Sequence, residues 1–157
     1  MEINDKAPDF SSLDQDSSPV ALEDYKGQWL VLYFYPRADT PGCTIEASSF
    51  RDSFERLGAT GAVVVGVSPD TPAAQKKFAG KYHLPFTLVA DRDKKICTAY
   101  GVMREKNMYG KKVMGVERTT FILGPDGRIR RIFRKVKPEG HAEEVVKYLK
   151  EAQEGPP

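Results

Sequence analysis

Three stretches of the chain are apolar at almost every position rather than at every second one: Trp29–Tyr35, Ala62–Val67 and Phe86–Ala90. All three are rich in β-branched or aromatic residues, which favour extended backbone. A strand that is buried on both faces loses the alternation of polar and apolar residues, because neither face meets water. The three stretches are therefore predicted to be central strands of a sheet, and Pro36 ends the first of them.

Helices are predicted between and after these strands, near residues 41–57, 72–82, 93–99 and 139–153. The second is marked by Thr71 as a capping residue and Pro72 in the first turn, where a missing N–H does no harm. In the last helix, Val145, Val146 and Leu149 recur at helical spacing and form one apolar stripe. Such a stripe predicts a helix that packs against a sheet.

A hairpin completes the predicted pattern, with strands at Thr119–Leu123 and Arg128–Phe133 joined by the turn Gly124–Gly127. The first 28 residues indicate turns and short strands. The resulting order is that of an α/β protein with a thioredoxin fold, an N-terminal β extension and an inserted strand and helix. Right-handed crossovers then place helices on both faces of the sheet. No repeat or linker divides the chain, so residues 1–157 are expected to form a single domain with a disordered tail at 154–157.

Composition narrows the class of protein. The chain has 157 residues, 40% of them hydrophobic and 29% charged, with a formal net charge of +2. Near neutrality argues against nucleic acid as a partner, and the apolar stretches are too short to cross a membrane. The first residues lack the features of a secretory signal, so a cytoplasmic location is expected. With two cysteines and two histidines, the sequence suggests no disulfide framework, no metal site and no cofactor.

Cys43 is the candidate for chemistry, because it falls where the first buried strand gives way to a helix. With Thr40 as the N-cap and Pro41 at the first helical position, Cys43 occupies the third position of the helix. Free N–H groups and the positive end of the helix dipole favour an anion there, and the thiolate is the reactive form of cysteine. The alternative from the residues alone is a small core residue at the start of a helix.

The segment around Cys43 resembles the active-site signature of peroxiredoxins, which contains Pro36, Thr40 and Cys43 at this spacing. The longer stretch Thr40–Ala47 is similar to the branch called bacterioferritin comigratory protein or PrxQ. The likeness covers nearly the whole chain. Further matching segments occur in the same order at residues 7–10, 30–36, 63–70, 100–102 and 118–121. Several motifs in one order are far more specific than one motif alone.

This resemblance implies a thiol-dependent peroxidase that reduces hydrogen peroxide and organic hydroperoxides through a sulfenic acid on Cys43. It implies that Arg118 stabilises the thiolate and the developing negative charge, and that the Thr40 hydroxyl and the Cys43 N–H bind the peroxide. Pro36 shields the sulfur from water, and Glu46 holds Arg118 in place or forms a mere surface pair with it. The implied reductant is thioredoxin or another thiol, and the implied state is a monomer or weak dimer.

The sequence departs from this branch at Ser48, where many members carry a resolving cysteine five residues after the nucleophile. Serine cannot form that disulfide, so a one-cysteine peroxidase is expected. Cys97 is the only other thiol and borders an apolar stripe that includes Ile96 and Tyr100. Its position indicates packing in preference to a resolving role.

Three further features leave alternatives open. Oxidation of Cys43 could serve a redox sensor that regulates a partner, since the first chemical step would be the same. The basic segment Arg128–Lys137 fits either a charged edge strand or a docking face for an acidic reductase. His83 and His141 have no partner by motif and are interpreted as solvated or packed side chains.

Overall fold

The computed structural model describes residues 1–154. The helices are the 3₁₀ turn η1 (Leu22–Tyr25), α1 (Pro41–Asp52), α2 (Phe54–Ala59), α3 (Pro72–Tyr82), α4 (Lys95–Ala99) and α5 (His141–Glu154). The strands are β1 (Ser11–Asp14), β2 (Pro19–Ala21), β3 (Trp29–Phe34), β4 (Ala62–Ser68), β5 (Thr87–Ala90), β6 (Met103–Met108), β7 (Lys111–Val116), β8 (Thr119–Leu123) and β9 (Ile129–Phe133).

The three continuously apolar stretches form the parallel centre of a seven-stranded sheet with the order β2-β1-β5-β4-β3-β8-β9. Strand β3 pairs in parallel with β4 and antiparallel with β8, and β4 pairs in parallel with β5. Gly66 in β4 lies beside Tyr33 in β3, and a Cβ at that position would come within 2.9 Å of the tyrosine ring. The glycine therefore lets the Tyr33 ring lie flat across the centre of the sheet.

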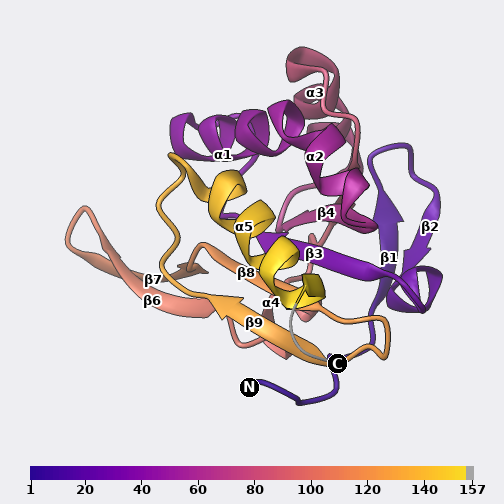
Figure 1. Cartoon of the computed structure of the whole chain (residues 1–157). Helices are drawn as coiled ribbons and strands as arrows, with labels where there is room; N and C mark the ends of the chain where they lie inside the picture. The colour runs from indigo at the N-terminus through magenta and orange to yellow at the C-terminus, as the bar shows by residue number, and fades with distance from the viewer. Residues whose placement is uncertain (155–157) are drawn as a thin grey trace.

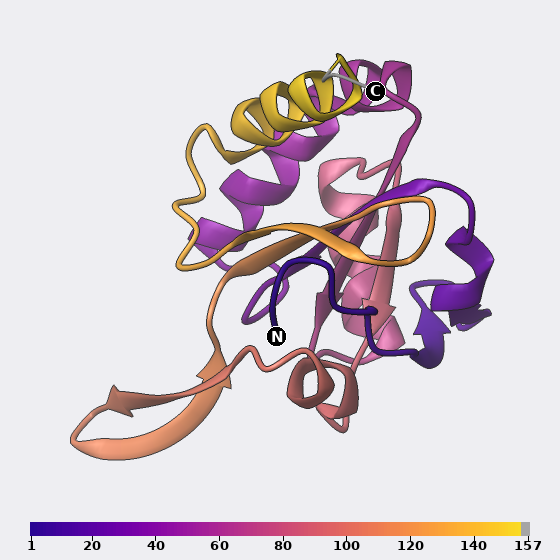
Figure 2. The same ribbon diagram turned by 60° about the horizontal axis from the view of Figure 1, so that its bottom comes forward.

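Two apolar cores lie on opposite faces of this sheet. One includes residues of β3 and β4 together with α1, α2, α3 and α5, while the other is covered by α4, the N-terminal segment and the base of the β6–β7 hairpin. Figures 1 and 2 show α1 and α5 side by side over one face, with α4 on the other side. This arrangement is the predicted thioredoxin-like α/β fold, and β1 and β2 are its N-terminal extension.

The structure corrects two sequence predictions. The single helix predicted near residues 41–57 is broken at Ser53, whose ψ of 6° departs from helical geometry, so that α1 and α2 are separate. The segment between α4 and β8 contains a two-stranded sheet, β6–β7, that the hydrophobic pattern did not predict. Within the tail predicted to be disordered, Glu154 ends α5, and residues 155–157 lie outside the described part of the chain.

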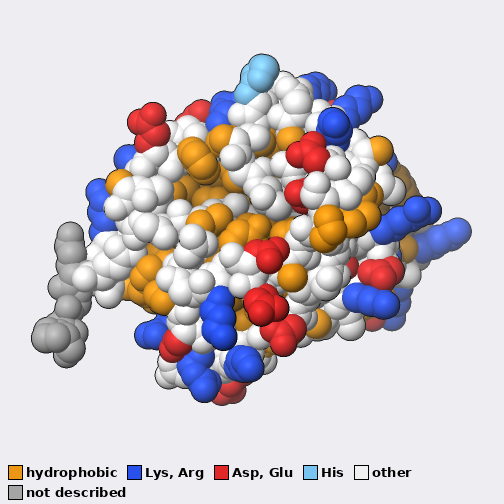
Figure 3. Space-filling model, turned by 90° about the vertical axis from the view of Figure 1, so that its right-hand side faces the viewer, with side chains coloured by type: hydrophobic (Ala, Val, Ile, Leu, Met, Phe, Trp, Pro, Cys, Tyr) orange, Lys and Arg blue, Asp and Glu red, His pale blue; other side chains and the backbone are white. Residues whose placement is uncertain are grey.

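Acidic and basic side chains are mixed on the surface near the short strands β1 and β2 (Figure 3). Figure 3 shows basic and acidic side chains interspersed on the face that corresponds to the right-hand side of Figure 1, near β1 and β2. Strand β9 is at the edge of the sheet, which supports the interpretation of the basic residues there as protection of an open edge. Among the described residues, no helix combines the length and the apolar character needed to cross a membrane.

Candidate active site

Cys43 lies in the first turn of α1, which follows the central strand β3 after a loop at residues 35–40. Thr40 has extended backbone angles and is the N-cap, Pro41 is the first helical residue, and the Thr44 N–H donates to the Thr40 carbonyl at 2.8 Å. Cys43 is therefore the third residue of the helix, as the sequence predicts. Its side chain belongs to the core beneath α1, and only 1% of the residue is exposed.

The loop that precedes the helix is held by hydrogen bonds. The Thr40 hydroxyl donates to the Arg37 carbonyl at 2.8 Å, so its oxygen keeps the capacity to accept a hydrogen bond from a ligand. The Ala38 N–H donates to Asp70 Oδ2 at 2.8 Å, and Asp70 in turn accepts from the Ser68 hydroxyl at 2.6 Å. Asp70 was not singled out from the sequence as a residue of the site. Its position after the neighbouring strand β4 was the signal that could have placed it beside this loop.

Arg118, on the short segment between β7 and β8, reaches the sulfur of Cys43. Its Nη1 and Nη2 atoms each lie 3.5 Å from Cys43 Sγ, so the two ends of the guanidinium fork face one sulfur. Gly42 makes this approach possible, because a Cβ there would come within 3.0 Å of Arg118 Nη2. The need for glycine next to the cysteine was not apparent from the sequence. This geometry places the positive charge of the guanidinium directly beside the sulfur.

Glu46 lies one turn after Cys43 and binds Arg118 from inside the protein. Arg118 Nη1 donates to Glu46 Oε1 at 2.7 Å, and the Glu46 side chain is fully buried, so the pair is not the surface interaction considered from sequence. Glu46 Oε2 has no hydrogen-bond partner among the described residues. Burial raises the pKa of Glu46 to about 7, although Arg118 acts in the opposite direction. Burial alone would lower the pKa of Arg118, but Glu46 and Cys43 outweigh it and raise that pKa.

The raised pKa of Glu46 predicts that part of the pH dependence of stability comes from this residue. Its carboxyl group ionises near 4.5 in an unfolded chain and at about 7 in the folded protein. Keeping this carboxylate ionised in the folded protein therefore costs free energy. This cost first appears as the pH rises through 4.5, and it reaches its full value above about 7. We expect this group to make the protein less stable at pH 8 than at pH 5, by on the order of 2 to 3 kcal/mol.

Urea unfolding of the parent protein and of Glu46→Gln at pH 5 and pH 8 measures this contribution. The glutamine oxygen can still accept from Arg118 but cannot ionise, so the substitution should remove the predicted loss of stability at high pH. Glu55→Gln is the matched control, because it makes the same change from carboxylate to amide at an exposed position on α2. If parent and Glu46→Gln lose the same stability between the two pH values, Glu46 does not titrate there.

The structure places Cys97 and Ser48 away from the sulfur of Cys43. Cys97 is buried in the second core, on the opposite face of the sheet, and its N–H donates to Asp91 Oδ2 at 2.8 Å. Burial, together with the Asp91 carboxylate, raises the pKa of the Cys97 thiol, which disfavours its reactive form. Ser48 is half-buried in the middle of α1. These positions support the interpretation of Cys97 as a packing residue.

The two histidines also have distinct environments. His83 is exposed and ends α3 in a left-handed conformation. His141 is buried at the start of α5, where Nε2 lies 2.7 Å from the Thr120 hydroxyl and Nδ1 lies 2.7 Å from Glu144 Oε1. Burial lowers the pKa of His141 in spite of Glu144. The sequence interpretation of a solvated and a packed histidine agrees with both positions.

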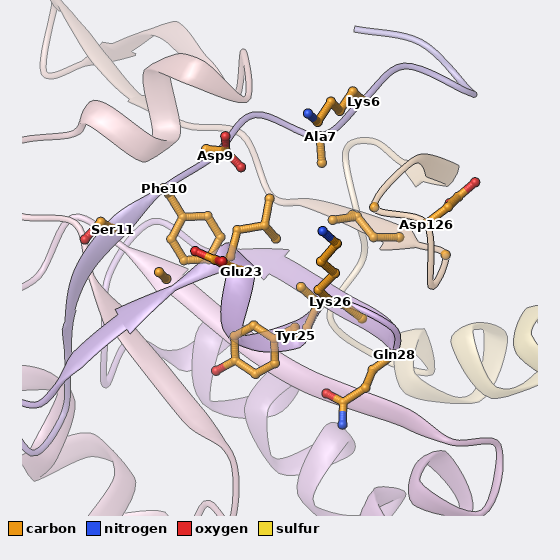
Figure 4. Close-up of a pocket in the computed structure, with 16 residues that line it drawn as sticks. Lys6, Ala7, Asp9, Phe10, Ser11, Glu23, Tyr25, Lys26, Gln28 and Asp126 are labelled. Carbon is orange, nitrogen blue, oxygen red and sulfur yellow. The ribbon is translucent and has the colours of Figure 1, made fainter.

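A concavity lies at the end of the sheet where β3 begins, opposite the end that leads to Cys43. It is a cleft of about 770 Å³ whose lining includes Leu30, at the start of β3, and Leu123, at the end of β8. Figure 4 shows Phe10 and Tyr25 along it, with Lys26 and Asp126 on its rim. None of the predicted site residues line this cleft. In the described part of the chain, no cluster of histidine, cysteine, aspartate or glutamate could hold a metal ion.

The fold and the site agree with known proteins. Residues 3–132 match the AhpC/TSA family. A putative peroxiredoxin Bcp of Coxiella burnetii is 47% identical over 146 residues, which cover 93% of this chain and 97% of the relative. Peroxiredoxin Bcp of Bacillus subtilis is 44% identical over 154 residues, covering 98% of both chains. The chain belongs to the AhpC/TSA family, as a peroxiredoxin of the Bcp/PrxQ branch.

Solved structures agree with this assignment. A PrxQ mutant of Xylella fastidiosa superimposes on the peroxiredoxin with a TM-score of 0.93 at 40% identity, covering 98% of each chain. The bacterioferritin comigratory protein of Xanthomonas campestris, described with an alkyl peroxide reduction activity, gives a TM-score of 0.89 at 39% identity over 97% of each chain. The resemblance seen in the sequence motifs is thereby confirmed, and with it the general function of a thiol peroxidase.

Proposed function

We propose that this peroxiredoxin reduces hydrogen peroxide and organic hydroperoxides with the Cys43 thiolate, and that an external thiol such as thioredoxin regenerates it. The observation that carries the proposal is the guanidinium of Arg118, with two nitrogens each 3.5 Å from Cys43 Sγ. A fork of fixed donors around one sulfur is suited to a reaction in which negative charge moves from sulfur to oxygen.

In the proposed reaction, the Cys43 thiolate attacks one peroxide oxygen and the O–O bond breaks. The sulfur becomes a sulfenic acid, and the other oxygen leaves as hydroxide or alkoxide and takes a proton, giving water or an alcohol. Charge therefore passes from the sulfur to the leaving oxygen in the transition state. Arg118 can donate to both, because its two Nη atoms offer several N–H groups in one plane.

The surroundings of Cys43 fit the remaining roles in this proposal. The Thr40 hydroxyl donates to the Arg37 carbonyl, so its oxygen is available to accept the proton of the bound peroxide. Pro36 is half-buried and carries no N–H that could compete for the sulfur. Glu46 fixes the orientation of Arg118 through the 2.7 Å ion pair. Because Cys43 itself is almost fully buried, the peroxide reacts in a site that largely excludes water.

The second half of the proposed cycle requires a thiol from outside the chain. Ser48 carries no sulfur, and Cys97 lies in the core on the other face of the sheet. Two cysteines can form a disulfide only when their Cα atoms approach within roughly 7 Å with suitable orientation, which these cores prevent without unfolding. We therefore expect a one-cysteine cycle, in which the sulfenic acid persists until an external thiol attacks it.

One equivalent of hydrogen peroxide is expected to add one oxygen, about 16 Da, at Cys43, with no internal disulfide. Dimedone should trap the product at Cys43, and excess peroxide should drive it to the sulfinic acid. Intact-mass spectrometry and peptide mapping give both results. A loss of about 2 Da with a peptide that links Cys43 to Cys97 at high yield would contradict the one-cysteine cycle. Sustained turnover with added thioredoxin then distinguishes a peroxidase from a redox sensor.

Ser48→Cys is the matched variant for this experiment. Residues five apart on a helix lie on different sides of it, so a disulfide between positions 43 and 48 requires the first turns of α1 to unwind. On oxidation we expect this variant to lose about 2 Da, resist dimedone and show lower helicity in far-UV circular dichroism. Ser49→Cys, one position further along α1, is the control for introducing a thiol into this helix.

A further inference from the structure

The hairpin formed by β6 and β7 extends away from the body of the protein, as both ribbon views show (Figures 1 and 2). Its outer part carries exposed apolar side chains at Met108, Tyr109, Val113 and Met114, and Tyr109 is 99% exposed. We call residues 108–114 the hairpin tip. A cluster of exposed apolar side chains on a projecting element is typical of an interaction surface.

The turn itself is unfavourable for the residue that occupies it. Tyr109 and Gly110 connect the strands with φ values of 52° and 78°, which is the positive range of a tight hairpin turn. Glycine, asparagine and aspartate adopt such angles readily, whereas a tyrosine there is strained. Because its ring is also fully exposed, no contact within the described chain compensates for this choice. Tyrosine is among the residues most enriched in protein interfaces.

One face of the hairpin is cationic. Residues opposite each other in the β6–β7 register share a face, which places Arg104, Lys106 and Lys111 together with Met108 and Val113. The only acidic side chain within the two strands belongs to the opposite face. Lys111, next to the turn, has no carboxylate within ion-pair distance among the described residues. Arg104 lies 3.7 Å from Glu117 and Lys106 Nζ donates to the Val116 carbonyl, so the open charge of this face is Lys111, beside the apolar side chains of the tip.

The hairpin is directly connected to the active site. Strand β7 ends at Val116, and Arg118, two residues later, contacts Cys43 Sγ. The Arg118 carbonyl also accepts from the Val136 N–H at 3.0 Å, which ties this segment to the loop before α5. A protein bound to the cationic face would thus lie at the end of the molecule that carries Cys43.

We propose that the hairpin tip and its cationic face are the docking surface for the protein dithiol that reduces oxidised Cys43, and that this partner presents an acidic surface around an apolar contact. The inference rests on the proposed function, because it assumes that Cys43 is resolved from outside the chain. Charge complementarity selects the partner: a second copy of this chain would bring two cationic faces together, which like-charge repulsion disfavours.

The chemistry at this surface is balanced by the dithiol alone. One thiolate of the partner attacks the sulfenic sulfur of Cys43, forming a mixed disulfide, while the oxygen leaves as hydroxide and takes a proton to become water. The second thiol of the partner then attacks the partner's other sulfur, the one bonded to Cys43 in the mixed disulfide. Cys43 is released as a thiolate, and the partner leaves as an oxidised disulfide.

Stopped-flow kinetics on the full chain separate docking from chemistry, with an acidic thioredoxin as the protein dithiol and dithiothreitol as the small one. The test variant is Tyr109→Asn with Lys111→Glu, because asparagine suits the turn and glutamate reverses the charge. We expect reduction of oxidised Cys43 by thioredoxin to slow at least about tenfold. Oxidation by hydrogen peroxide and reduction by dithiothreitol should stay within about twofold of the parent.

The control is Lys147→Glu, an exposed charge reversal on α5 that should leave all three rates unchanged. Added salt should slow the thioredoxin reaction of the parent more than that of the test variant. The docking proposal is overturned if thioredoxin reduces parent and test variant equally fast, or if it fails to reduce a parent that dithiothreitol does reduce. It is also overturned if the peroxide rate falls in the test variant.

Two other results have distinct meanings. If neither thiol restores the oxidised parent, the proposed function itself fails, independently of where a partner docks. If anionic phospholipid vesicles bind the parent but not the test variant while thioredoxin reduces both equally, the hairpin is a membrane contact and the docking proposal is wrong.

Discussion

Cys43→Ser is expected to abolish peroxide consumption completely, whereas Cys97→Ser should retain the first oxidation step. A serine hydroxyl is not ionised near neutral pH and cannot act as a nucleophile beside Arg118, even with the same geometry. Cys97 lies on the other face of the sheet, in a core where burial disfavours its thiolate. Peroxide disappearance in a single turnover, with each protein in excess, measures both rates without involving a reductant.

The two variants also control for each other. Both replace a buried sulfur by a hydroxyl, so each is expected to lose some stability from the unfavourable burial of a polar group. Urea unfolding tests whether both variants remain folded under the conditions of the assay. Equal loss of the first oxidation step in two folded variants would mean that Cys43 is not the nucleophile.

Arg118→Lys is expected to lower the second-order rate constant with hydrogen peroxide by at least about tenfold, although the charge is kept. The guanidinium presents two nitrogens to Cys43 Sγ and one of them also to Glu46 Oε1. An ammonium group is a single point of charge and cannot hold both partners while it donates to a peroxide oxygen. The loss should therefore appear in the oxidation step, before any thiol is added.

Arg56→Lys is the matched control for this substitution. Arg56 forms an ion pair with Glu143, but both side chains are largely exposed, so a lysine should serve there almost as well. We expect its peroxide rate to equal that of the parent protein. An unchanged rate constant in a folded Arg118→Lys variant would remove Arg118 from the reaction.

The central strands and most helix starts could be predicted from the sequence, because burial and capping leave clear local signals. Helix α3 runs over Pro72–Tyr82, as Thr71 and Pro72 indicate. The β6–β7 hairpin could not be predicted in this way. Its strands are largely exposed on both faces, so no periodic pattern marks them, and Tyr109 is not a residue that indicates a tight turn. The break at Ser53 also lacks a glycine or proline to announce it.

At the site, local sequence placed Cys43 correctly because Pro41 marks the first turn of α1, although the Thr40 hydroxyl donates to the Arg37 carbonyl and does not cap the helix. The contact with Arg118 joins residues 75 positions apart, and only the family resemblance predicted it. Even the resemblance did not show that Glu46 is fully buried with one oxygen unpartnered, since burial depends on how α1 packs against the sheet. Asp70 was missed for the same reason, as its bond to the Ala38 N–H joins two separate loops.

The pairing of β3 with β8 has a consequence for how the chain folds. Arg118 immediately precedes β8, and more than 80 residues separate β8 from its neighbour β3 along the chain. Contacts between segments so distant in sequence form slowly during folding. During synthesis, Cys43 leaves the ribosome long before Arg118 does. Until β8 docks against β3, Cys43 lacks its guanidinium neighbour, so we expect the proposed reactivity toward peroxide only once the sheet is complete.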